Sequence, residues 1–154
     1  MGRFDGRGAI VTGGALGIGG SCARRLAADG AGVLIVDINE EAGASNVRRI
    51  REAGGKAEFM AGDVAQESVA SEMVEKAVSS LGRLDLLIQN AYGGGAGSAG
   101  SAVEVAPDDW HRGMDLLVGA LYLGAKFGVP AMEDSGADPG FKPGPWEGAG
   151  RRHG

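Results

Sequence analysis

The sequence predicts an α/β fold built on a parallel sheet. Two observations lead to this prediction: short apolar runs alternate four times with longer segments of helical periodicity, and no hairpin turn joins two of the runs. Such alternation is typical of βαβ units with right-handed crossovers. The chain has 154 residues, of which 44% are hydrophobic, so we expect one domain with a sizeable core.

The first half of the chain is expected to contain two strands, each followed by a helix. Residues 9–11 form a short β-branched run, and residues 17–29 carry apolar side chains at four-residue spacing. The run 33–36 is wholly apolar, as expected for a parallel strand that is covered on both faces. Residues 40–53 follow as a mostly polar helix. The first helix is expected to carry Ile18, Cys22 and Leu26 on one face, and the second is expected to turn Val47 and Ile50 inward.

The second half repeats the pattern and then changes character. Strands are expected over 58–61 and 84–89, and helices over 68–81 and from 107 to about 129. The last 22 residues, 133–154, contain six glycines and three prolines, which forbid a regular helix or a central strand. We therefore predict a domain over residues 1–132 and a disordered tail over 133–154.

Composition argues against several classes of function. Acidic residues outnumber basic ones by 20 to 15, which disfavours nucleic acid or an anionic membrane as a general partner. The longest apolar run, residues 116–125, is well short of the ~20 residues that span a membrane. The single cysteine, Cys22, excludes a disulfide within the chain and a cysteine-based zinc site. These features fit a reducing compartment such as the cytoplasm.

A glycine-rich turn joins the first predicted strand to the first predicted helix. It reads Thr-Gly-Gly-Ala-Leu-Gly-Ile-Gly over residues 12–19, with glycines at the spacing GxxxGxG. In a dinucleotide-binding turn, such glycines make the tight turn, let the backbone approach the pyrophosphate and allow the helix to pack closely on the strand. The helix N-terminus adds N–H groups and the positive end of its dipole. The alternative is a purely structural turn, which the position between a strand and a helix disfavours.

An acidic residue, Asp37, ends the second predicted strand, 18 residues after Gly19. A carboxylate at this place can accept hydrogen bonds from both hydroxyls of an adenosine ribose, and its charge would repel a 2′-phosphate. No Arg or Lys lies between Gly13 and Gly20 to offset that charge. The pattern therefore predicts a preference for NAD over NADP. The alternative is that Asp37 caps the next helix.

These motifs, taken in order, resemble those of the short-chain dehydrogenase/reductase family. The family carries a TGxxxGIG turn, an acid followed by an aliphatic residue near the adenine, and an NNAG motif; residues 12–19, Asp63-Val64 and Gln89-Asn90-Ala91 match them. The resemblance covers roughly residues 4–132. It departs from the pattern at Gln89, which replaces the first Asn of NNAG, and at Tyr92, which replaces its Gly.

The resemblance implies a fold, a cofactor and a set of binding residues. The fold is a Rossmann-like, doubly wound parallel sheet with strand order 3-2-1-4, incomplete at the edge of the fourth strand. The activity is hydride transfer between NAD and an alcohol or carbonyl substrate. In the family, residues at the positions of Asp63 and Val64 lie by the adenine, and those at Asn90 and Ala91 lie near the nicotinamide-side ribose. The implied cofactor-binding residues are Gly13, Leu16, Gly17, Ile18, Gly19, Asp37, Asp63, Val64, Asn90 and Ala91.

The family's catalytic residues have no counterpart in this chain. The active-site asparagine of the family maps to Leu117, which can neither donate nor accept a hydrogen bond. After the fourth helix the family has a strand bearing a catalytic Ser and a helix bearing Tyr-x-x-x-Lys, but no tyrosine follows Met132. Tyr122 and Lys126 have the Tyr-x-x-x-Lys spacing, yet no serine-bearing strand precedes them. We therefore expect no catalytic residue and no metal ligand in this chain.

Three hypotheses follow for function. The first is the cofactor-binding half of an NAD-dependent short-chain dehydrogenase, which lacks the catalytic segment. The second is a non-catalytic dinucleotide-binding or interaction module whose sheet is completed by a partner. The third is a methyltransferase of similar topology, which the GxxxGxG spacing and the segment 89–91 disfavour. Because the family's fifth strand would cover the run 84–89, and because its fourth helix usually packs on a partner subunit, we also expect self-association.

Overall fold

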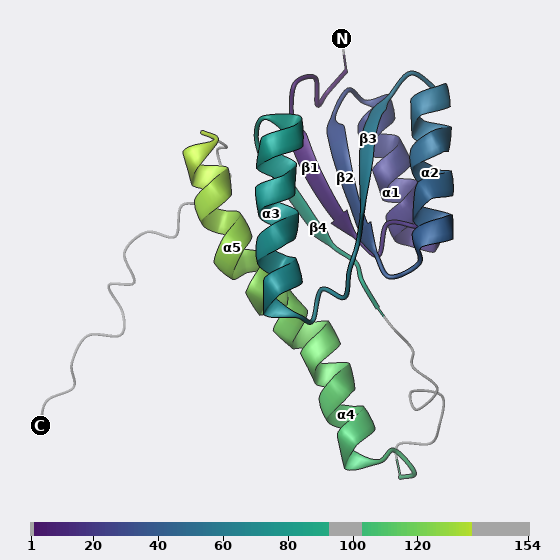
Figure 1. Cartoon of the computed structure of the whole chain (residues 1–154), viewed down its shortest axis with the longest axis vertical. Helices are drawn as coiled ribbons and strands as arrows, with labels where there is room; N and C mark the ends of the chain where they lie inside the picture. The colour runs from purple at the N-terminus through teal and green to yellow at the C-terminus, as the bar shows by residue number, and fades with distance from the viewer. Residues whose placement is uncertain (1, 93–102, 137–154) are drawn as a thin grey trace, which may run out of the picture.

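The computed structural model describes residues 2–92 and 103–136 of the chain. It contains a sheet flanked by helices, with the strands and helices alternating as predicted (Figure 1). The strands are β1 (Gly8–Thr12), β2 (Gly32–Asp37), β3 (Lys56–Ala61) and β4 (Leu86–Gln89). The helices are α1 (Gly17–Ala28), α2 (Glu40–Glu52), α3 (Glu67–Leu81), α4 (Pro107–Met114), the π-helical segment η1 (Asp115–Gly119) and α5 (Ala120–Asp134).

The four strands form a parallel sheet in the order β3-β2-β1-β4, which confirms the predicted fold class. Val11 of β1 lies between Ile35 of β2 and Ile88 of β4 in the register of the sheet. All five residues of β1 are buried, because helices cover both faces of the sheet. The fold is therefore Rossmann-like, with β3 and β4 as the two edges within the described residues.

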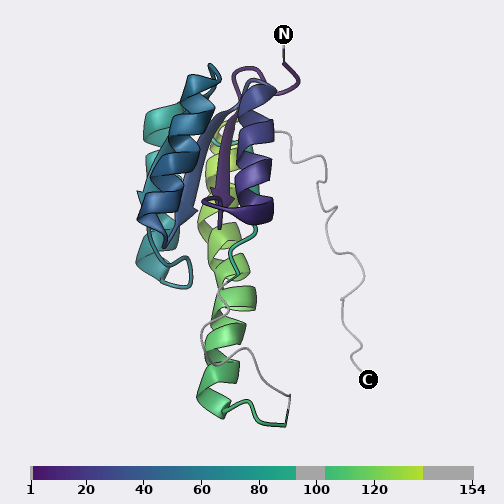
Figure 2. The ribbon, with the colours of Figure 1, turned by 90° about the vertical axis from the view of Figure 1, so that its right-hand side faces the viewer.

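Two apolar cores lie on opposite faces of the sheet. On one face, alternate side chains of β1 and β2 pack against α1 and α2, where Val47 and Ile50 point inward as predicted. On the other face, Ile10 and Leu34 pack against α3 and α5. Figures 1 and 2 show this layering, with α1 and α2 on one side of the strands and α3 and α5 on the other.

The buried face of α1 is not the face that Ile18, Cys22 and Leu26 share. Leu26 is buried, but Ile18 is 78% exposed and Cys22 is only partly covered. The residues that face the sheet are mostly small, because a Cβ atom on Gly19 would lie 2.2 Å from the carbonyl oxygen of Gly13. Close approach of α1 to β1, rather than the spacing of the larger apolar residues, therefore sets its orientation. The buried residues of α1 are Gly19, Gly20, Ala23, Leu26 and Ala27.

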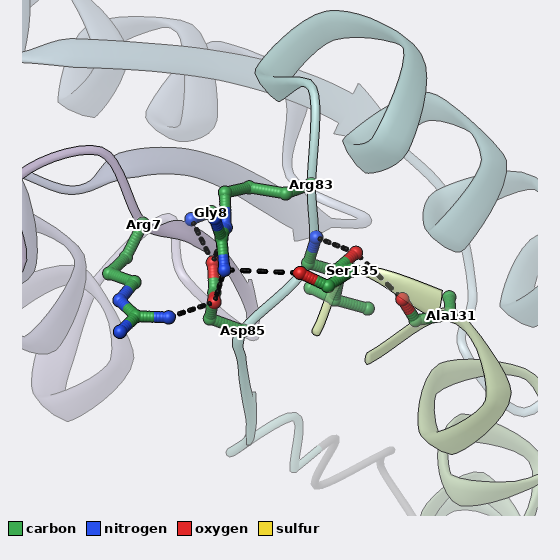
Figure 3. A network of polar contacts seen from close by, with 7 residues as sticks. Arg7, Gly8, Arg83, Asp85, Ala131 and Ser135 are labelled. Atoms are coloured by element: carbon green, nitrogen blue, oxygen red, sulfur yellow. Dashed lines mark hydrogen bonds and ion pairs between the residues drawn. The ribbon is translucent and has the colours of Figure 1, made fainter. Parts of the chain in front are cut away.

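The last helical stretch is longer than predicted and is not uniform. It was expected to end near Val129, but it continues through Pro130, which lies inside α5, to Asp134. Its end is held from outside: Ser135 Oγ accepts a hydrogen bond from Leu84 N at 3.0 Å, and Arg83 Nη2 donates to the Ser135 carbonyl at 3.2 Å (Figure 3). Residues 133 and 134, which the sequence analysis assigned to a disordered tail, are helical. The rest of that tail from residue 137 to residue 154 lies outside the described part of the chain.

Strand β4 is shorter than the predicted run 84–89. Leu84 precedes the strand and is fully buried, so the expectation that it lies on an uncovered edge is wrong. Leu86 and Ile88 are only partly buried against the α1–α2 core.

The stretch Pro107–Asp134 is long and apolar enough to cross a membrane by length and composition, a criterion that helices in the cores of soluble proteins also meet.

Candidate functional site

A cleft of about 970 Å³ lies at the carboxyl ends of the parallel strands. In open parallel α/β sheets this is the end at which ligands bind. The segments that follow β1, β2, β3 and β4 all contribute to its wall, and residues of α4 and η1 add a further side. Every predicted cofactor-binding residue except Gly19 lines it: Gly13, Leu16, Gly17, Ile18, Asp37, Asp63, Val64, Asn90 and Ala91.

The glycine-rich turn has the backbone geometry that only glycine adopts readily. Gly13 and Gly17 have φ values of 63° and 56°. A Cβ atom on Gly17 would meet no atom within 4 Å, so this part of the turn faces open space. Leu16 is the N-cap of α1 and makes no side-chain capping bond. The turn therefore presents backbone N–H groups at a helix N-terminus, a setting that suits an anion such as a phosphate.

Gly19 serves the packing of the turn rather than its surface. It is buried, and any side chain there would collide with the Gly13 carbonyl and with the amide group of Asn90. Of the three roles expected for the glycines of the motif, Gly19 has that of close packing between helix and strand. It supports the cleft from beneath and does not line it.

The carboxylate of Asp37 lies at the end of β2 and is held by two backbone amides. Its Oδ2 accepts a hydrogen bond from Ala15 N at 3.0 Å, and its Oδ1 accepts one from Asn39 N at 3.0 Å. The N-cap of α2 is Asn39, whose side chain accepts from Ala42 N, so Asp37 is not the cap of that helix. Each carboxylate oxygen keeps further acceptor capacity toward the cleft.

The segment after β3 adds one exposed acid and one buried apolar side chain to the cleft. Asp63 is exposed, and its Oδ1 accepts a hydrogen bond from Ala65 N at 3.0 Å. Val64 is buried against the core that includes Met60 and Ala70. The pair thus offers a polar edge beside an apolar surface, which fits a flat heteroaromatic ring with polar edges.

The end of β4 is fastened to the glycine-rich turn. The backbone N–H groups of Asn90 and Ala91 both donate to Thr12 Oγ1, at 3.1 and 3.2 Å, and Asn90 Nδ2 donates to the Gly13 carbonyl at 3.3 Å. Thr12 is 2% exposed, and sequence reasoning did not single it out as more than part of the motif. The feature of the sequence that could have indicated this role is a residue with a hydroxyl group at the end of an otherwise apolar strand.

Residues of the last helical stretch also reach the cleft, and no sequence motif predicted them. Asp109, Arg112, Asp115 and Leu116 line its outer side. Arg112 Nη1 pairs with Asp109 Oδ1 at 3.3 Å on the solvent side of α4. They were missed because they lie about 50 residues beyond Asp63 in the chain and only the fold brings them to the same cleft.

Tyr122 and Lys126 do not take part in the cleft. Tyr122 is 63% exposed, and neither residue lines the cleft wall. Lys126 Nζ lies 2.5 Å from Glu67 Oε1 of α3, and this hydrogen bond raises the pKa of Lys126 above its ordinary value. The pair is therefore a surface feature of α5. Within residues 2–92 and 103–136, no cluster of three or more His, Cys, Asp or Glu side chains could hold a metal ion.

Comparison with known proteins gives a consistent result. Residues 7–138 match the family model described as short chain dehydrogenase. A 3beta-hydroxysteroid dehydrogenase of Mediterraneibacter gnavus is 37% identical over 136 residues, which are 88% of this chain and 49% of that protein. A 7alpha-hydroxysteroid dehydrogenase of Escherichia coli K12 is 34% identical over 87% of this chain and 51% of its own length. The chain thus spans about half of the length of these curated relatives.

Solved structures agree with the sequence matches. A 7alpha-hydroxysteroid dehydrogenase in complex with NADH and 7-oxo glycochenodeoxycholic acid has a TM-score of 0.80 and 34% identity, covering 87% of this chain and 51% of its own. A carveol dehydrogenase from Mycobacterium avium in complex with NAD has a TM-score of 0.80 and 26% identity, covering 88% of this chain and 53% of its own.

Proposed function

The chain belongs to the short-chain dehydrogenase family, and on that premise we propose that it binds NAD in the cleft at the carboxyl ends of its strands. It is then the cofactor-binding part of an oxidoreductase that transfers hydride between NAD and an alcohol or carbonyl substrate. The observation that carries the proposal is the convergence of the predicted residues on one cleft, although they come from four separate segments of the sequence.

Different residues of the cleft bind different parts of the dinucleotide. The pyrophosphate is held by backbone N–H groups at the start of α1, beside Gly17, where the absence of a side chain leaves open space. Asp37 accepts hydrogen bonds from the adenosine ribose, and Asp63 and Val64 flank the adenine. Asn90 and Ala91 lie toward the nicotinamide-side ribose. The cleft, at about 970 Å³, is at the upper end of the usual range of ~300–1,000 Å³ for small-molecule sites.

Bound NAD would supply a hydride acceptor, whereas the described residues of the cleft supply binding groups. The hydroxyl among them is that of Tyr92, which is 68% exposed. Leu117, at the position of the family's active-site asparagine, offers no hydrogen bond. We propose that the residues in hand bind and orient the cofactor and that none of them is catalytic. The relatives named above act on different compounds, steroids and carveol, so likeness to them supports no single substrate.

A second candidate function is a non-catalytic dinucleotide-binding module that associates with a partner. The observation that favours it is an apolar groove on the α1 side of the edge strand, where Ile18, Cys22 and Leu26 lie beside Ile88 of β4. A partner, including a second copy of this chain through its last helical stretch, would cover such surfaces. Under either function we propose a cytoplasmic protein, since a chain with a single cysteine has no internal disulfide and so fits a reducing compartment.

Calorimetric titration of the full chain with NAD, NADP and S-adenosylmethionine tests the cofactor proposal. We expect saturable binding of NAD, weaker binding of NADP and none of S-adenosylmethionine. Tighter binding of NADP would contradict the assigned role of Asp37, and binding of S-adenosylmethionine alone would contradict the oxidoreductase proposal. Adding a polypeptide that corresponds to the second half of the E. coli relative separates the two functions, since activity gained on mixing favours the enzyme.

A further inference from the structure

A buried polar side chain lies directly behind the glycine-rich turn. Asn46 is on α2, is 3% exposed and stands next to Val47, which belongs to the apolar core. Its Nδ2 donates to the Gly14 carbonyl at 2.8 Å and to the Gly20 carbonyl at 3.3 Å. One side chain of α2 therefore joins the middle of the turn to the first turn of α1.

An arginine of α1 completes this contact. Arg24 Nη1 donates to Asn46 Oδ1 at 2.8 Å, and Arg24 Nη2 donates to Ser21 Oγ at 2.9 Å. Ser21 Oγ in turn donates to the Gly17 carbonyl at 3.0 Å. The carbonyls of Gly14, Gly17 and Gly20 are thus held by one connected set of side chains.

The chemistry of the donors fixes which way the amide of Asn46 points. A guanidinium group can only donate, so the atom of Asn46 facing Arg24 has to be the oxygen. The NH₂ group then faces the two carbonyls, where both of its hydrogens are used. Within the described part of the chain, no buried side-chain polar atom lacks a partner, so the arrangement carries no desolvation penalty of that kind.

The turn is a segment that needs such support. Glycine loses more conformational freedom on ordering than any other residue, and this turn has glycines at 13, 14, 17 and 19, with Gly20 next in the chain. A ligand that bound to a loose turn would have to order it, at a cost in affinity. Side chains that hold the carbonyls in advance leave the N–H groups pointing at the cleft before any ligand arrives.

We propose that Asn46 and Arg24 are positioning residues that hold the glycine-rich turn in the conformation that binds the pyrophosphate of a dinucleotide. The inference rests on the proposed binding of NAD, and it assigns to α2, through Asn46, a part in the affinity of the site. The glycine motif itself does not include either residue. Neither lines the cleft, so both act through the turn.

The substitution Asn46→Asp tests this sharply. It keeps the size of the side chain and an acceptor for Arg24, but it removes the donor to Gly14 and Gly20. Val47→Ala is the matched control, since Val47 is the neighbouring buried residue of α2 and its truncation weakens the core without touching a hydrogen bond of the turn. Thermal unfolding of both variants shows that each is folded and reports its loss of stability.

Two ligands separate positioning from general destabilisation. ADP-ribose contains the pyrophosphate, whereas adenosine lacks it. We expect Asn46→Asp to weaken ADP-ribose about tenfold, as the loss of a buried hydrogen bond implies, and adenosine less than twofold. Val47→Ala should leave both dissociation constants within twofold. Equal weakening of both ligands in Asn46→Asp, or no weakening of either, would overturn the inference while leaving NAD binding by the unmodified chain as a separate result.

A second measurement needs no ligand and therefore tests the inference independently of the proposed function. If the unmodified chain did not bind ADP-ribose, that result would count against the proposed function, and hydrogen exchange would still test the inference. Hydrogen exchange of the backbone amides from Gly13 to Gly20 should speed up in Asn46→Asp and in Arg24→Met, and return toward the original rate in Arg24→Lys, which restores a donor to Asn46 Oδ1. Unchanged exchange in the first two variants would show that the turn does not depend on this pair.

Discussion

The side chain of Asp37 and the backbone of Ala15 are joined by a hydrogen bond of 3.0 Å that links the end of β2 to the turn after β1. The carboxylate expected to bind the ribose is therefore also part of the structure of the glycine-rich turn. Its second oxygen accepts from Asn39 N, so the group is fixed in orientation before a ligand binds. A substitution of Asp37 therefore changes both the contact expected with the ribose and the support of the glycine-rich turn.

Replacing Asp37 with Ala should weaken NAD more than NADP. Loss of the bond to Ala15 N weakens both cofactors, but loss of the negative charge also removes repulsion of the 2′-phosphate, which benefits NADP alone. The ratio of the two dissociation constants, measured by calorimetry, is expected to shift about tenfold or more toward NADP. Asp37→Asn is the comparison variant, because it removes the charge but keeps one carbonyl oxygen, which can accept from Ala15 N or from Asn39 N but not from both. An unchanged ratio in both variants would mean that Asp37 does not contact the ribose.

The chain by itself should show no dehydrogenase turnover. A tuned proton donor and preorganised groups around the substrate provide most of the rate in such enzymes. Among the described residues of the cleft, the one hydroxyl belongs to Tyr92, which is 68% exposed, so we expect neither feature there. The measurement is absorbance of NADH at its reduced-nicotinamide band with a panel of alcohols and ketones. Turnover that disappears in Tyr122→Phe would assign catalysis to the exposed pair of Tyr122 and Lys126, against our expectation.

The chain should self-associate at micromolar concentration. The last helical stretch exposes several large apolar side chains, and no strand pairs with the outer edge of β4 within the described residues. Light scattering coupled to size exclusion should give a mass above that of a monomer. Leu121→Lys should shift the mass toward the monomer, whereas Ile38→Lys, which charges an exposed residue lining the cleft, should not. The exposed apolar residues of the stretch are Trp110, Met114, Leu117, Val118, Leu121, Tyr122 and Val129.

A buried carboxylate at the opposite end of the sheet should contribute to stability. The side chain of Asp85 is 5% exposed and accepts hydrogen bonds from Arg83, Arg7 and the amide of Gly8 (Figure 3). Burial taken by itself would raise its pKa, but these hydrogen bonds outweigh burial and lower the pKa from 3.8 to about 2. Because the folded state favours the ionised form, the stabilisation is complete above pH ~4 and is lost as the pH falls through about 2.

Asp85→Asn should therefore cost on the order of 2 kcal/mol of unfolding free energy at pH 7. Urea unfolding at a series of pH values checks the sign: the gap between the original chain and the variant should narrow between pH ~4 and ~2. Asp29→Asn is the control, since Asp29 pairs with an exposed arginine of the same helix and should change stability by less than ~0.5 kcal/mol. A pH-independent gap would mean that the ionised form of Asp85 is not what stabilises the fold.

Much of the fold could be predicted because each strand, helix and turn depends on residues that are neighbours in the sequence. The apolar run 33–36 became the centre of β2, and the glycine-rich turn lies between β1 and α1 as expected. Where the prediction was wrong, longer-range packing was the reason. Ile18 is exposed because the small residues of α1 meet the sheet, and the helix continues past Pro130 to an end where Arg83 and Leu84 hydrogen-bond Ser135.

The order of strands and helices along the chain, the position of the glycine-rich turn and the place of Asp37 at the end of a strand follow from the amino-acid sequence, since each depends on neighbouring residues and on the periodicity of apolar side chains. Three features are visible only in the folded chain: Asp37 binds Ala15, Asn46 and Arg24 hydrogen-bond behind the turn, and α4 forms a wall of the cleft. These contacts join residues far apart in the chain. They depend on how closely each helix approaches the sheet. The size of the side chains between helix and sheet sets that distance, and no pattern of neighbouring residues in the sequence predicts it.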